Sequence, residues 1–176
     1  MNQDTITRRD FWMAGGAALT TAALMPGGVH AEDGDKPDLQ YELLFDMRAQ
    51  LETPQMLGDT PHGNRMIFDV TGGRIEGPKI NADILSSGGD WFRTRSDGVS
   101  ELDVRATLKT DDGALVYVHY TGLLHTKTPD GSQYFRTTPR FETSSEKYDW
   151  INNLIAVGYG WQPGPNEVSY RVFAIL

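Results

Sequence analysis

The chain has 176 residues, of which 39% are hydrophobic and 23% charged, and its formal net charge is -8. This length suits one domain with a proper core, and the acidic balance argues against binding to nucleic-acid phosphates. The absence of cysteine excludes a disulfide framework, a thiol nucleophile and a thiolate metal site.

The first 31 residues have the features of an export signal. "TRRDFWM" (Thr7–Met13) places an arginine pair before an aromatic residue, and an uncharged stretch follows as far as Met25. "VHA" (Val29–Ala31) fits the small-residue pattern of a cleavage site. The uncharged stretch is interrupted by glycines and is shorter than the roughly 20 apolar residues of a membrane span. We therefore expect twin-arginine export of a folded protein, cleavage after Ala31, and a periplasmic domain from 32 to 176 without stable membrane insertion.

The remainder of the chain predicts strands from end to end. Turn chemistry separates them, including Asp-Gly pairs at Asp97, Asp112 and Asp130. The predicted strands are Tyr41–Leu51, Arg65–Val70, Gly73–Leu85, Asp90–Arg95, Val99–Lys109, Ala114–Leu124, Gln133–Thr138, Leu154–Trp161 and Glu167–Leu176. The segment between the first two strands, Glu52–Asn64, is expected to be a mobile loop.

One short helix is predicted, near residues 144–153. Thr143 can cap it, Glu146 completes a capping box, and Tyr148, Ile151 and Leu154 recur on one side. Many short antiparallel strands with one helix indicate an all-β barrel or sandwich.

The stretch "ELDVRATL" (Glu101–Leu108) alternates charged or polar residues with apolar ones, so its charged row lies on one face of a strand. If Asp112 and Gly113 form a two-residue turn, Arg105 faces Tyr120 on the next strand, and a four-residue loop keeps this parity. The charged row would then share its face with bulky residues, as in the wall of a ligand cavity. A three-residue loop would reverse the assignment.

These residues resemble a known family. "GGRIEGPKINADILSSGGDWFRTRSDGVSELDVRATLKTDDGALVYVHYTG" (72–122) and "YFRTTPRFETSSEKYDWINNLIAVGYG" (134–160) contain motifs such as "GGDW" and "YFRT.PRFET" in order. They resemble the bacterial and fungal family known as domain of unknown function 3237. The resemblance implies a single antiparallel β-barrel with a lipocalin-like outline. It also implies that the protein is a cofactor-free enzyme or a binder of small, often aromatic molecules. His119 and Tyr120 depart from the family pattern, since arginine is expected more often on the strand that carries them.

The candidate site residues are carboxylates, arginines and proton carriers. A carboxylate that is partly desolvated acts as an acid or base near neutral pH, and a neighbouring arginine stabilises an oxyanion. The candidate catalytic residues are Asp103, Arg105, Glu142 and Tyr117, and the candidate substrate-binding residues are Asp90, Trp91, Arg136, His119 and Tyr120.

Several of these residues also have structural interpretations. Asp103 and Arg105 lie two apart and can form an ion pair, Glu142 suits the start of a helix, and Tyr117 suits a core. The histidines do not form a ligand cluster, and neither a nucleophile elbow nor a nucleotide-binding glycine motif is present, so we expect no metal and no cofactor.

Two functions of different classes follow from these observations. The first is a cofactor-independent lyase or isomerase for a small aromatic compound, for example one that eliminates formaldehyde from a lignin-derived phenolic dimer. The second is a non-catalytic carrier or sensor with the same pocket. The expected partner is a small aromatic molecule and not nucleic acid, and an exposed edge strand would favour a homodimer.

Overall fold

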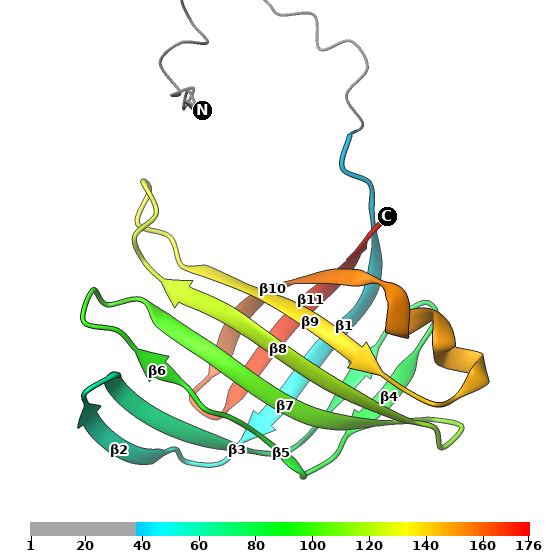
Figure 1. Cartoon of the computed structure of the whole chain (residues 1–176), viewed down its shortest axis with the longest axis horizontal. Helices are drawn as coiled ribbons and strands as arrows, with labels where there is room; N and C mark the ends of the chain where they lie inside the picture. Colours follow the sequence, from blue (N-terminus) through cyan, green and yellow to red (C-terminus); the bar gives the residue numbers. More distant parts are fainter. Residues whose placement is uncertain (1–37) are drawn as a thin grey trace, which may run out of the picture. The chain divides into compact units, whose positions relative to one another are not determined.

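The computed structural model describes residues 38–176, so the expected export signal and its cleavage site lie outside the described residues. The described chain is an antiparallel β-barrel with one short helix (Figure 1). Its elements in order are β1 (Tyr41–Leu51), β2 (Gln55–Thr60), β3 (Gly63–Glu76), β4 (Asn81–Ile84), β5 (Gly88–Asp90), β6 (Arg93–Thr94), β7 (Ser100–Thr110), β8 (Leu115–His125), β9 (Tyr134–Glu142), the 3₁₀ helix η2 (Glu146–Asn153), β10 (Ile155–Gly164) and β11 (Glu167–Ile175). Within this part of the chain, no helix has the length and hydropathy to cross a membrane.

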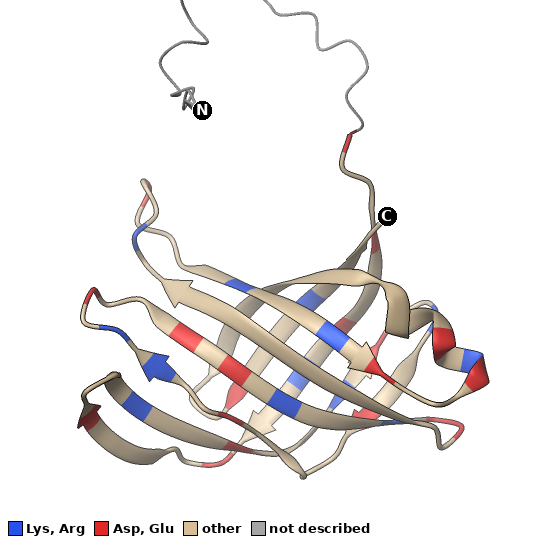
Figure 2. Ribbon diagram, in the orientation of Figure 1, with Lys and Arg blue, Asp and Glu red and all other residues tan. Residues whose placement is uncertain are grey.

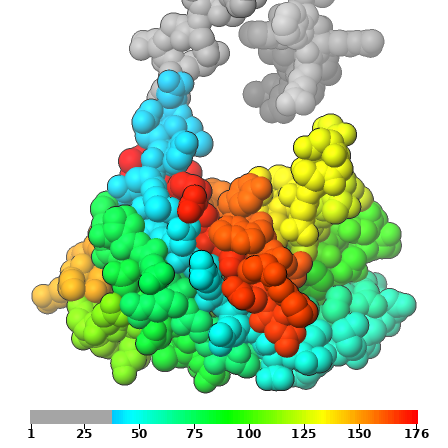
Figure 3. Space-filling model, turned by 180° about the vertical axis from the view of Figure 1, so that it is seen from behind, coloured from blue at the N-terminus to red at the C-terminus, as the bar shows by residue number. Residues whose placement is uncertain are grey.

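The barrel closes through strands that are distant in the sequence. Hydrogen-bonded neighbours run in the order β1, β11, β10, β9, β8, β7, β4, β3, and β3 pairs again with β1. From the far side, β1 lies between the green segment of β3 and β4 and the red β11 (Figure 3). Closure leaves β2, which pairs with β3 outside this ring, as an edge strand.

The predicted fold class, a single all-β antiparallel barrel with one short helix, is confirmed. Two strand assignments were wrong. The expected loop at 52–64 contains β2 and its hairpin with β3, and β3 continues without interruption to Glu76. The predicted strands Gly73–Leu85 and Asp90–Arg95 are instead the end of β3 and the three short strands β4, β5 and β6, each of which pairs with both β3 and β7.

The helix lies where it was expected, but it is a 3₁₀ helix and its cap differs. Ser145 occupies the N-cap position without a side-chain capping hydrogen bond. Thr143 instead uses its hydroxyl to link the segment before η2 to the start of β8, because it accepts a hydrogen bond from Ser145 N–H and donates one to the Leu115 carbonyl. Tyr148 and Ile151 are buried, so helix packing on the barrel end replaces the capping box.

The core fills the barrel with one side of each strand. On β7 the buried hydrophobic residues are Leu102, Val104, Ala106 and Leu108, and on β8 they are Val116, Val118 and Tyr120. Burial therefore alternates with the two-residue period of both strands.

The hairpin between β7 and β8 has a three-residue loop, so the parity expected from a two-residue turn was wrong. The Thr110 N–H donates to the Ala114 carbonyl across the loop, and Gly113 adopts a φ of +92°. This is the pattern of a turn followed by a left-handed glycine. Arg105 consequently faces His119 and not Tyr120. The charged row of β7 lies on the outer face of the barrel, whereas Tyr120 points inward.

The close approach of β5 to β7 requires glycine at position 88. A Cβ atom there would lie 2.3 Å from the Arg105 carbonyl oxygen and 2.9 Å from the Ala106 Cα atom. We expect Gly88→Ala to lower the free energy of unfolding by about 3 kcal/mol, measured by urea denaturation, because β5 must move away from β7. Gly164→Ala is the matched control, since no atom lies within 4 Å of its added Cβ. Equal effects of the two substitutions would contradict this account.

Candidate functional site

A row of outward-facing side chains crosses the barrel from β3 to β10. Register pairs join Arg65 to Arg93, Arg93 to Glu101, Glu101 to Leu123, and Leu123 to Arg136, which pairs in turn with Tyr159. Directly opposed residues in a sheet share a face, so six strands contribute to one continuous surface. Red and blue segments follow one another along β7 on this surface (Figure 2).

Beside this row, three side chains form a cluster around Asp103. Its Oδ1 atom lies 3.0 Å from His119 Nε2 and 3.1 Å from Arg105 Nη1. The three side chains are 41%, 37% and 43% exposed, so water reaches all of them. Trp91 borders the cluster, and the Arg105 guanidinium lies 5.3 Å from the centre of its ring. A carboxylate in its ionised form only accepts hydrogen bonds, so toward such a carboxylate His119 Nε2 is the donor of this pair.

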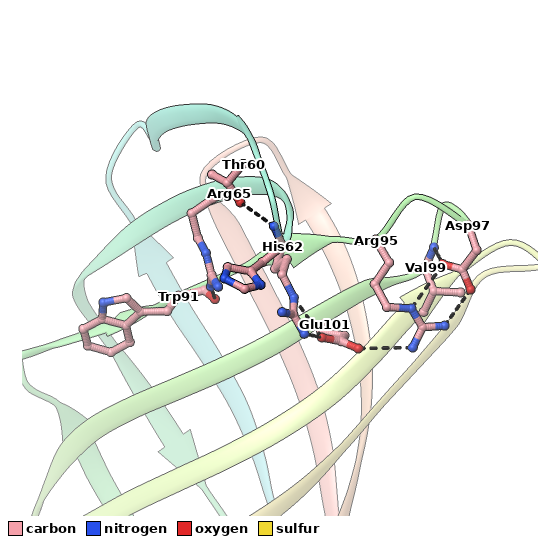
Figure 4. Close-up of polar contacts among 9 residues, drawn as sticks. Thr60, His62, Arg65, Trp91, Arg95, Asp97, Val99 and Glu101 are labelled. Atoms are coloured by element: carbon pink, nitrogen blue, oxygen red, sulfur yellow. Dashed lines mark hydrogen bonds and ion pairs between the residues drawn. The ribbon is translucent and has the colours of Figure 1, made fainter.

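Ion pairs and hydrogen bonds fix one rim of this surface (Figure 4). Arg65 donates to the Trp91 carbonyl oxygen, and Glu101 accepts from Arg93 and, at 3.1 Å, from Arg95. The hydrogen bond from Arg93, followed by the one from Arg95, lowers the pKa of Glu101. This carboxylate therefore stays charged and holds the two arginines in place.

Between these groups the outer face is hollowed into a groove of about 930 Å³. Its lining includes the apolar side chains of Leu123 and Val157, the aromatic rings of Trp91 and Tyr134, and the Asp103 cluster. We call this feature the outer groove. Its size and its mixture of apolar and oriented polar groups match those of small-molecule sites.

The barrel interior holds a second, much smaller polar site. A cavity of about 70 Å³ is lined mainly by apolar side chains, together with Asp90, Tyr120 and Tyr170. The two tyrosine rings meet edge to face at 5.6 Å. An engineered cavity that binds benzene is about 150 Å³, so the interior cavity is about half that size in this conformation.

Asp90 links the interior to the outer groove. The residue is 9% exposed, and its Oδ1 atom accepts a 3.0 Å hydrogen bond from the backbone N–H of Asp103. Burial raises the pKa of Asp90 to about 7, although this hydrogen bond opposes the increase. Burial also raises the pKa values of Tyr120 and Tyr170, so both remain protonated at neutral pH.

The structure divides the predicted site residues among three places. The outer groove contains Asp103, Arg105, His119, Trp91 and Arg136. The interior cavity contains Asp90 and Tyr120. Glu142 and Tyr117 pair with each other and line a separate shallow depression beside the end of β9.

Sequence reasoning missed several residues of both sites. Tyr134 lies two positions before Arg136, so strand alternation alone places the two on one face. Tyr170 belongs to the alternating apolar row of β11, which would have placed it inside the barrel. Arg65, which lines the groove, and Tyr159, which contacts Arg136, carry no comparable signal, because only the order of the strands brings them to these positions. Among residues 38–176, no three His, Asp or Glu side chains gather as metal ligands.

The sequence matches the family model described as a protein of unknown function, DUF3237, over residues 39–175. The chain belongs to this family. A UPF0311 protein of Clostridium acetobutylicum is 32% identical over 68% of this chain and 84% of its own length, and one of Rhodopseudomonas palustris is 32% identical over 69% and 88%. A hydroalkoxylation enzyme of Penicillium herquei, phnH, is 33% identical over 57% of this chain and 59% of its own length.

Solved structures of similar proteins have the same fold. A β-barrel-like protein of Acinetobacter baumannii is 34% identical and superposes with a TM-score of 0.75, covering 81% of this chain and 99% of the other. A conserved protein of Rhodopseudomonas palustris is 29% identical with a TM-score of 0.74, covering 80% and 100%. Similar proteins from other bacteria therefore share this architecture.

The raised pKa of Asp90 predicts a pH dependence of stability. Its pKa is about 7 in the folded chain and 3.8 as an unperturbed group, so the folded state binds more protons between these values. The contribution of Asp90 to the free energy of unfolding is therefore present below about pH 4 and is lost as the pH rises to about 7. We expect Asp90→Asn, which keeps the acceptor for Asp103 N–H, to gain stability relative to the unsubstituted protein over this range. The measurement is urea denaturation at a series of pH values, and a stability difference that does not change with pH would refute the assignment.

Proposed function

We propose that this DUF3237 protein is a cofactor-independent lyase or isomerase that acts on a small aromatic compound in the periplasm, with the outer groove as its active site. The observation that supports this most is the contact of Asp103 with both His119 and Arg105 inside a groove large enough for an aromatic molecule. The interior cavity is the weaker choice, because its volume is less than a tenth of that of the outer groove.

The cluster can move a proton without a cofactor. Histidine is the side chain whose charge changes nearest to neutral pH, and a carboxylate that holds one ring nitrogen orients the other toward a substrate. His119 would remove a hydroxyl proton, Asp103 would hold the imidazole, and Arg105 would stabilise the developing oxyanion. Trp91, which lines the groove, offers a ring for stacking.

Elimination of formaldehyde is one reaction that these residues could carry out with proton transfers alone. The proton of a hydroxymethyl group passes to His119, the bond between the two carbons breaks, and formaldehyde leaves. The carbanion that remains then takes up the proton, so no oxidant or reductant is needed. The Penicillium herquei relative is named a hydroalkoxylation enzyme. Hydroalkoxylation adds an alcohol across a carbon–carbon double bond, so it also moves one proton. The reverse of this reaction is an elimination.

The direct test is incubation of the purified protein with a panel of aromatic dimers, without added cofactor, followed by mass spectrometry. A product that is isomerised or has lost formaldehyde would support the proposal. If no member of the panel reacts while several bind, the protein is a carrier or sensor instead. The mutual pairing of Asp103, Arg105 and His119 favours this second candidate function, since the same contacts also stabilise a groove that only binds.

Substitution of Asp103 separates catalysis from binding. We expect Asp103→Asn to lower kcat by about 10²-fold or more with little change in ligand affinity, because the imidazole loses the charge that orients it. Asp83→Asn is the control, since Asp83 pairs with Arg74 and does not line the groove. Parallel losses of rate and affinity in Asp103→Asn would contradict the catalytic role.

A further inference from the structure

The outer groove has a charge that opposes the charge of the whole chain. The chain has a formal net charge of -8. The groove is nevertheless lined by four arginines, from β3, β6, β7 and β9, against the two carboxylates of Glu101 and Asp103. The groove is therefore a local positive site that attracts anions, although the protein as a whole is acidic.

Two of these arginines are neutralised by the two carboxylates. Arg93 pairs with Glu101, and Arg105 pairs with Asp103. Arg65 and Arg136 make no ion pair with any carboxylate of residues 38–176, and Arg65 is held by the Trp91 carbonyl. The positive excess is thus concentrated on Arg65 and Arg136, at opposite sides of the groove.

Arg136 is held in one orientation by aromatic rings. Its guanidinium lies 3.8 Å from the centre of the Tyr159 ring and 5.0 Å from that of Tyr134. Its Nη1 atom donates a 2.9 Å hydrogen bond to the Phe135 carbonyl oxygen. A guanidinium has five N–H groups in a planar fork, so this hydrogen bond leaves further donors for a carboxylate. Stacking on the rings fixes the plane of the fork before a ligand arrives.

The surface next to Arg136 suits the apolar part of the same ligand. Leu123 is its register partner on β8 and is 40% exposed, and Val157 lies on β10 nearby in the groove. From Leu123 the groove continues along β8 to His119, four residues or about 13 Å away. A ligand that contacts both Arg136 and His119 is therefore elongated.

We propose that the outer groove binds an elongated aromatic carboxylate, with its carboxylate on Arg136 and its rings over Leu123, directed toward the Asp103 cluster. This inference rests on the proposed function for the identity of the reacting end and adds the substrate class to it. The anionic end binds at Arg136, while the end that reacts reaches His119. Arg136 is in this account a binding residue that selects charged over neutral aromatic compounds.

The test compares a carboxylate with its neutral isostere. Biphenyl-4-carboxylate and biphenyl-4-carboxamide are titrated into the full-length protein and followed by calorimetry. We expect the carboxylate to bind about tenfold or more tightly, because hydrogen bonds to charged groups contribute more than neutral ones. Arg136→Gln should abolish this preference, and Arg136→Lys, which keeps the charge but loses the fork, should retain only part of it. Arg48→Gln, on an exposed residue of β1 outside the groove, should leave it unchanged.

Two outcomes would overturn the inference. One is equal affinity for the two compounds in the unsubstituted protein, and the other is an equal loss of preference in Arg48→Gln and Arg136→Gln. Circular dichroism of each variant verifies that the barrel is folded. Because these titrations measure no turnover, selective binding without any reaction would count against the proposed enzyme alone. Turnover of neutral aromatic compounds without preference for acids would count against this inference alone.

Discussion

The register between β7 and β8 determines which side chains lie on the inner and the outer face of the barrel. A three-residue loop from Asp111 to Gly113 places Asp103 opposite Thr121 and Arg105 opposite His119. A shift by one residue would turn the charged row into the core and the apolar row toward water. Burial of the apolar rows of both strands opposes such a shift, so the hydrophobic core also positions the outer cluster.

The sheet separates a buried and an exposed carboxylate, and one hydrogen bond from a backbone N–H to a side chain connects their residues. Inside, the Asp90 carboxylate lies among apolar side chains and has a raised pKa. Outside, Asp103 contacts Arg105 and His119, which water reaches. The Asp103 N–H that donates to Asp90 belongs to the residue whose side chain holds His119. The buried carboxylate thus stabilises the backbone on which the outer cluster is built.

Most of the fold could be predicted from local patterns, whereas the site depended on register and strand order. Alternation and turn residues predicted the barrel, because each strand buries one row of side chains. The same alternation grouped Asp103 with Arg105. It could not distinguish a two-residue from a three-residue turn, so it assigned these charges to the wrong face. Tyr159 became a neighbour of Arg136 only because β9 pairs with β10.

The central claim is that ligands bind on the outer face of the barrel and not inside it. Methyl NMR of the protein during titration with biphenyl-4-carboxylate tests this claim directly, because leucine and valine methyl groups line both places. The account predicts that the methyl signals of Leu123 and Val157 in the outer groove shift, while those of Val104 and Val168 in the interior do not. Shifts confined to Val104 and Val168 would place the ligand in the barrel and contradict the account.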